Sequence, residues 1–142
     1  MKNFVLVALA VGLLVGADKP KKDKGTTVLE GTWVIVSLTE NGFKSDETGK
    51  DKVVFQGKNM TVKREEITPQ RLTYKIDPDK KTIDIISAEG DDKDKTFKGI
   101  YQLKKRELKI CFAPPDKDRP KEFTSEEHSY HTLLVLKRAK PK

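Results

Sequence analysis

The stretch Gly31-Thr32-Trp33-Val34-Ile35-Val36-Ser37-Leu38 decides the fold, because β-branched and apolar residues follow a glycine in the manner of a strand. Similar short runs recur along the chain, separated by residues that favour turns. No segment has a 3.6-residue apolar period over the length that a helix requires. The sequence therefore predicts an all-β chain with eight strands, at residues 33–38, 53–55, 60–62, 72–76, 82–85, 96–103, 108–112 and 130–137.

The connections between these runs indicate hairpins. Asn41-Gly42, Gly57-Lys58 and Asp77-Pro78-Asp79-Lys80 have the composition of tight turns, and 45–52 is a polar connection. A flat eight-stranded sheet would leave two edges and one apolar face in contact with water, whereas closure removes the edges. We therefore predict a single eight-stranded antiparallel up-and-down β-barrel.

The N-terminus has the order of a secretory signal peptide. Lys2 precedes an apolar run at 4–15, and Val15-Gly16-Ala17 fits a cleavage site. The run is shorter than the roughly 20 residues of a membrane span, so no stable span is expected after cleavage. The expected organisation is a signal peptide at 1–17, a flexible lead-in at 18–27, a barrel domain at 28–138 and a basic tail at 139–142, exported to the periplasm or beyond the cell.

Charge and length limit the choice of partners. The chain has 142 residues, which suffices for one domain, and a formal net charge of +7. Export argues against a nucleic-acid partner, so a polyanion of the cell envelope is the more natural target of this charge. The alternative is that the basic ends of the chain are simply solvated tails.

Two features resemble a known fold family. Gly31-Thr32-Trp33 is similar to the Gly-X-Trp signature at the head of the first lipocalin strand. Arg138 ends the last predicted strand, where lipocalin-like folds often place a basic residue over the tryptophan. In a closed barrel the first and last strands are neighbours, so a guanidinium can stack on the indole. The resemblance implies that Gly31, Trp33 and Arg138 close the barrel.

A longer ordered pattern resembles a family of exported, lipocalin-like proteins that is abundant in planctomycete bacteria and has no assigned activity. Its segments are 29–33, 98–101, 108–115, 119–123 and 131–138, so the resemblance covers about 28–138. The connection 104–107 departs from the pattern, because it lacks a glycine, and a wider turn is expected there. The family carries no catalytic residues to transfer.

The barrel interior is the candidate binding site, for a small apolar or amphipathic ligand. Gly99 and Ser37 are expected to enlarge it, and Phe123 to fold over its open end. The alternative is a filled barrel with a basic surface, acting as an envelope interaction or structural module. The candidate ligand-binding residues are Ile35, Phe55, Tyr74, Phe97, Tyr101, Ile110 and Phe112.

No constellation for catalysis, a metal or a cofactor stands out. His128 and His131 would point to opposite faces of a strand, and the acidic loop 89–94 lacks the ligand pattern of a calcium loop. There is no Gly-X-Ser-X-Gly elbow, so a non-enzymatic protein is expected. Cys111, the single cysteine, is either a small filler on a partly covered face or an exposed thiol that could dimerise the protein. The oligomeric state stays open.

Overall fold

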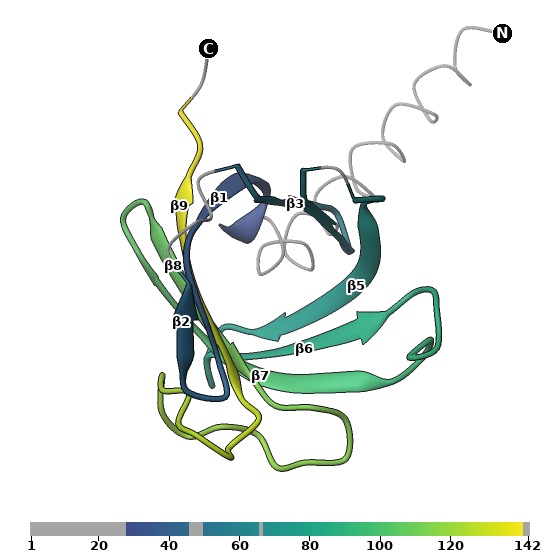
Figure 1. Cartoon of the computed structure of the whole chain (residues 1–142). Helices are drawn as coiled ribbons and strands as arrows, with labels where there is room; N and C mark the ends of the chain where they lie inside the picture. The colour runs from purple at the N-terminus through teal and green to yellow at the C-terminus, as the bar shows by residue number, and fades with distance from the viewer. Residues whose placement is uncertain (1–27, 46–49, 66, 141–142) are drawn as a thin grey trace, which may run out of the picture.

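The computed structural model describes residues 28–45, 50–65 and 67–140. The described residues form one antiparallel sheet whose strands follow one another around a barrel (Figure 1). The predicted signal peptide and lead-in lie outside the described residues, as does the end of the basic tail. The strands are β1 (Gly31–Glu40), β2 (Phe43–Ser45), β3 (Lys52–Gln56), β4 (Asn59–Lys63), β5 (Gln70–Asp77), β6 (Thr82–Ser87), β7 (Thr96–Lys104), β8 (Glu107–Phe112) and β9 (Thr132–Arg138).

Pairing of β1 with β9 closes the barrel. From β3 to β9 each strand pairs with the next one along the chain, and β1 pairs with β3 on one edge and β9 on the other. In Figure 1 β1, β8 and β9 lie side by side in one wall, and β5, β6 and β7 curve around the opposite side. The closed eight-stranded antiparallel barrel predicted from the sequence is therefore confirmed.

The ninth strand, β2, is an addition to the predicted set. It forms a hairpin with the end of β1 through Asn41 and Gly42, which both have positive φ angles (48° and 91°). The turn was predicted, but Phe43-Lys44-Ser45 is too short to indicate a strand by alternation. All three residues are exposed, so β2 extends one edge of β1 without adding to the core.

A β-bulge in β1 changes which of its side chains point inward. Trp33 and Ile35 are buried, and the register against β9 then shifts between Ile35 and Ser37. After the shift Leu38 is paired with the buried Leu134. The expectation that Ser37 enlarges the interior is therefore wrong, because the extra residue of the bulge brings Leu38 to the inner face instead.

Gly99 does not enlarge the interior either. A Cβ at this position would lie 2.7 Å from the carbonyl oxygen of Cys111 and 2.9 Å from Cβ of Phe112. It would also lie 3.2 Å from Cγ2 of Ile83, so neighbouring groups already fill the space. The glycine serves the close approach of β6, β7 and β8.

The connection between β7 and β8 is narrower than expected. Lys104 and Glu107 are Cα partners, so only Lys105 and Arg106 form the turn. Lys105 adopts a φ of 51°, in the left-handed region that hairpin turns require and that glycine usually supplies. The expectation of a wider turn is therefore wrong: a lysine takes the glycine-like conformation here.

The long segment between β8 and β9 packs against the outer face of the barrel. The Cys111 thiol lies 3.3 Å from the carbonyl oxygen of Thr124. Arg119 forms an ion pair with Asp84 (2.8 Å) and donates a hydrogen bond to the carbonyl oxygen of Gly99 (2.8 Å). Cys111 is thus buried beneath this segment, as the filler interpretation predicts, and not exposed.

Candidate ligand cavity

Trp33 and Arg138 close one end of the barrel. They are Cα partners across β1 and β9, and Cζ of Arg138 lies 4.3 Å from the centre of the indole ring system. Arg138 donates hydrogen bonds to the carbonyl oxygens of Glu30 (2.9 Å) and Val28 (3.3 Å). The indole Nε1 donates to the carbonyl oxygen of Leu29 (2.8 Å), whose own side chain is fully buried. The segment before β1 is thereby held as a floor.

Gly31 allows this floor to form. Its φ is +127°, a conformation that other residues rarely adopt, and a Cβ would lie 2.9 Å from Nη1 of Arg138. The residues expected to close the barrel, Gly31, Trp33 and Arg138, are therefore brought together at one end.

The opposite end of the barrel contains a cavity of about 320 Å³. It lies between the ends of the strands that are remote from Trp33, where β4 ends and β5 begins and where β8 ends and β9 begins. Its polar lining residues are Glu40, Arg64, Gln70 and Thr132. Its apolar lining residues are Ile35, Leu38, Val53, Met60, Val62, Leu72, Ile85, Phe97, Phe112 and Leu134.

The cavity reaches solvent at a polar rim. Glu40, Arg64 and Gln70 line the cavity and are themselves exposed, whereas Ile35, Val53 and Met60 are buried. The guanidinium Nε of Arg64 lies 3.6 Å from a carboxylate oxygen of Asp51, which holds it near the mouth. The site is therefore apolar within and polar at its opening.

The structure divides the candidate ligand-binding residues into two groups. Ile35, Phe97 and Phe112 line the cavity. The other four are buried but do not line it. They fill the closed half of the barrel, and they are Phe55, Tyr74, Tyr101 and Ile110.

Aromatic packing explains why the closed half has no space for a ligand. The rings of Phe55 and Tyr74 meet edge to face, with centroids 4.8 Å apart. Burial raises the pKa of Tyr74 to about 12, with a smaller contribution from the nearby negative charge of Glu30. Burial likewise raises the pKa of Tyr101, followed by the negative charge of Asp77. These two hydroxyls stay protonated at neutral pH.

Sequence reasoning missed most of the cavity wall. Leu38 was hidden by the bulge, and Leu134 was part of a strand too uniformly apolar to show which side faces inward. Val62 lies near the open end of β4, and the polar rim residue Arg64 follows directly on that strand. Ile85 lies toward the open end of β6. Consecutive strands of an up-and-down barrel alternate in direction. The predicted strand order therefore could have shown which end of each strand lies opposite Trp33, at the mouth.

Phe123 does not form a lid in the structure. It is half-buried, and it is not among the residues around the cavity. Its segment is held against the barrel through Thr124, which contacts the Cys111 thiol, and through Ser125, whose hydroxyl accepts a hydrogen bond from the Gly42 N–H (3.4 Å). The expected lid is therefore wrong for this arrangement.

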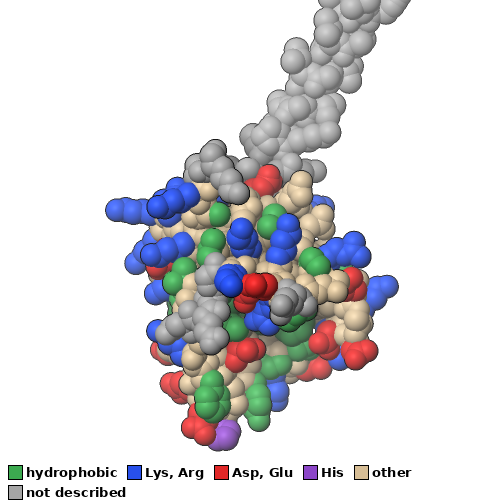
Figure 2. Space-filling view, turned by 45° about the horizontal axis from the view of Figure 1, so that its top comes forward, with side chains coloured by type: hydrophobic (Ala, Val, Ile, Leu, Met, Phe, Trp, Pro, Cys, Tyr) green, Lys and Arg blue, Asp and Glu red, His purple; other side chains and the backbone are tan. Residues whose placement is uncertain are grey.

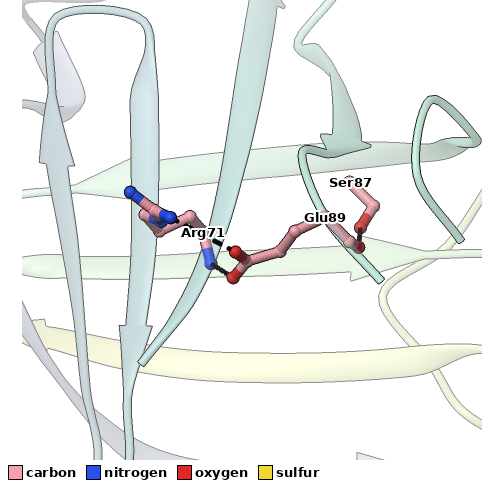
Figure 3. Close-up of polar contacts among 3 residues, drawn as sticks. All are labelled: Arg71, Ser87 and Glu89. Atoms are coloured by element: carbon pink, nitrogen blue, oxygen red, sulfur yellow. Dashed lines mark hydrogen bonds and ion pairs between the residues drawn. The ribbon is translucent and has the colours of Figure 1, made fainter. Parts of the chain in front are cut away.

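A second hollow lies on the outer face along β3, β4 and β5, and polar contacts hold the β6–β7 loop at its margin. Glu89 accepts hydrogen bonds from the backbone N–H of Arg71 (3.1 Å) and from its guanidinium (3.5 Å) (Figure 3). Its carbonyl oxygen accepts from the Ser87 hydroxyl (2.9 Å). These contacts fasten the β6–β7 loop to β5.

The described parts of the chain contain no cluster of three or more His, Cys, Asp or Glu that could hold a metal ion. Burial raises the pKa of the Cys111 thiol and outweighs the smaller lowering effect of the Thr124 backbone, so this thiol is a poor nucleophile at neutral pH. No helix within 28–45, 50–65 and 67–140 is long and apolar enough to cross a membrane.

Comparison of the chain with protein-family models, with curated proteins and with solved structures finds no match. The closed floor, the apolar cavity and the polar rim are the features from which a function is inferred.

Proposed function

We propose that the protein is an exported, non-enzymatic carrier that holds a small amphipathic ligand in the open half of its barrel. The observation that carries the proposal is the cavity of about 320 Å³, which lies in the half of the barrel remote from Trp33 and Arg138 and is open at a polar rim. Ligand sites are typically concave, mostly apolar and about 300–1,000 Å³ in volume, with a few polar groups that orient the ligand. This cavity meets those criteria at the lower end of the range, which favours a small ligand.

The division of the wall favours one orientation of the ligand. Its apolar part contacts Leu38, Met60 and Leu134, and its polar part stays at the rim with Arg64 and Gln70. The reverse orientation would bury a polar group against apolar walls without a hydrogen-bond partner, at a cost of about 1–3 kcal/mol.

Sequence features outside the described residues support the compartment. Lys2, the apolar run at 4–15 and the small residues near Ala17 favour export.

The ordered pattern across 28–138 supports membership of the exported lipocalin-like family to which the chain is similar. Both remain predictions from the sequence.

The second candidate function is an envelope interaction module that uses basic surface charge. On the face seen in Figure 2 some Lys and Arg side chains gather toward one edge, and others alternate with Asp and Glu. Binding to an anionic polymer would depend on this charge and would collapse with salt. Binding in the cavity depends on the apolar wall, so the two functions respond to different substitutions.

The test of the carrier function is titration of the purified mature protein with a fluorescent fatty acid. Val62→Trp would fill the cavity from β4, while Thr61→Trp adds the same side chain to the outer face of the same strand. We expect saturable binding to the wild type and to Thr61→Trp, and at least a tenfold loss of affinity for Val62→Trp.

Two results would overturn the carrier function. One is the absence of saturable binding to the wild type, and the other is equal binding by both tryptophan variants when their circular dichroism spectra match the wild type. Native mass spectrometry of protein from its own host would show a co-purifying ligand and the oligomeric state directly.

A further inference from the structure

A cluster of basic side chains lies beside the cavity mouth, where β3 begins and β4 ends. We call it the basic lip and define it as Lys50, Lys52, Lys63 and Arg64. Together with Glu65 these residues surround a shallow surface depression of about 440 Å³. All four basic residues are exposed, so their charges are accessible from solvent.

Arg64 joins the basic lip to the cavity. It lines both the depression and the cavity, and it follows directly on β4, whose Met60 and Val62 form part of the apolar wall. The hydrocarbon chain of a ligand could rest against Met60 and Val62. A head group that leaves the mouth on this side would then meet the Arg64 guanidinium first.

The charges of the basic lip are only partly balanced within the described residues. Lys50 forms an ion pair with Glu65 (3.4 Å), and Arg64 lies 3.6 Å from Asp51. Lys52 and Lys63 are Cα partners across β3 and β4, and neither has an acidic partner within ion-pair distance among the described side chains.

The pairing of Lys52 with Lys63 is unfavourable without an anion. Like charges directly opposite each other on antiparallel strands destabilise the sheet. An anion bound between the lysines and Arg64 would relieve that repulsion. A guanidinium adds two parallel hydrogen bonds to a carboxylate or phosphate, and the lysines add point charges.

From this arrangement we infer that the ligand is an anionic amphiphile, with its hydrocarbon chain in the cavity and a carboxylate or phosphate head group on the basic lip. The inference rests on the proposed carrier function and specifies its ligand class. A cationic head group would find fewer partners. Asp51 and Glu65 are already paired with Arg64 and Lys50, and Glu40 is the acidic residue that lines the described cavity wall.

The test compares four probes with the same hydrocarbon chain: decanoate, decyl phosphate, decanol and decylamine. Each displaces the fluorescent fatty acid from the mature protein at low salt. We expect decanoate, decyl phosphate or both to bind at least tenfold more tightly than decanol, and decylamine to bind no better than decanol. Which of the two anions gains affinity distinguishes a carboxylate from a phosphate ligand.

A matched pair of variants locates the head group. The double variant Lys52→Gln/Lys63→Gln removes two charges from the basic lip, and Lys58→Gln/Lys80→Gln removes two exposed charges from turns at the closed end. The lip variant should lose about five- to tenfold in affinity for the anion and nothing for decanol. The control should lose less than twofold. The lip variant should keep or raise the melting temperature, because a repulsive pair is removed.

Salt gives an independent measurement. The preference for the anion over decanol should shrink strongly near 1 M salt, where the Debye length is about 3 Å. Equal affinity of decanol and both anions, or an equal loss in the two double variants, would overturn the inference while leaving the carrier function standing. Failure of all four probes and of the fluorescent fatty acid would remove the carrier function itself, and the inference with it.

Discussion

Arg138 lies over the indole of Trp33, with its Cζ 4.3 Å from the ring centre, although the two residues are separated by almost the whole barrel sequence. The same guanidinium donates to the carbonyl oxygens of Glu30 and Val28. One side chain thus joins the last strand, the first strand and the segment before the first strand. This contact closes one end of the barrel. The cavity lies at the opposite end, which is open to solvent.

Replacement of Arg138 by methionine should destabilise the barrel by about 2 kcal/mol. The change keeps an apolar stem over the indole and removes the cation–π contact, about 0.5–2 kcal/mol, and the charged hydrogen bonds, about 1.5–3 kcal/mol. The sum is reduced because Arg138 is partly exposed. Urea unfolding followed by Trp33 fluorescence measures the loss. Lys137→Met, at the exposed neighbouring position, serves as the control, and an equal loss in both variants would contradict the proposed role.

Gly99→Ala should destabilise the protein although alanine is otherwise tolerated in strands. The added methyl group would lie 2.7 Å from the Cys111 carbonyl oxygen, a backbone atom that cannot move without disturbing the β7–β8 ladder. Such overpacking typically costs about 1–3 kcal/mol. Thermal unfolding of Gly99→Ala and of Lys98→Ala, an exposed neighbour, measures the effect. A melting temperature equal to that of Lys98→Ala would show that the sheet accommodates the methyl group.

The barrel could be predicted from the sequence because its strands alternate and its turns carry recognisable residues. Leu72, Tyr74 and Ile76 illustrate the alternation, and the turn at 77–80 illustrates the turn chemistry. The contact between Trp33 and Arg138 was implied by the resemblance to lipocalin-like folds, and it is possible because a closed barrel brings its first and last strands together.

The cavity wall was less accessible, for two physical reasons. A β-bulge is a local change of register that apolar alternation does not report, so Leu38 was not expected to face inward. Alternation also gives the face of a residue and not its height in the barrel. Phe55 and Phe97 are both inner-face residues, yet Phe55 fills the closed half and Phe97 lines the cavity.

Cys111 should be protected from alkylation in the native protein. Its thiol is fully buried beneath the segment that carries Thr124, and burial raises its pKa, so little thiolate is present at neutral pH. Iodoacetamide labelling followed by mass spectrometry should proceed only along the urea unfolding transition. Rapid labelling without urea would show that the β8–β9 segment opens readily, and a disulfide-linked dimer under mild oxidation would show the same.

Tyr74 should make the protein sensitive to alkali. Its pKa in the folded state is about 12, above the ordinary tyrosine value of 10.0, chiefly because of burial. The folded state therefore holds the phenolic proton more tightly, and the resulting stability is complete below pH 10 and is lost as the pH rises toward 12. Tyr74→Phe cannot ionise, so its free energy of unfolding should fall less steeply across this range. Urea unfolding at pH 8, 10 and 11 measures the two slopes, with Tyr130→Phe as the exposed control. Identical slopes in the wild type and Tyr74→Phe would mean that another group governs the alkaline transition.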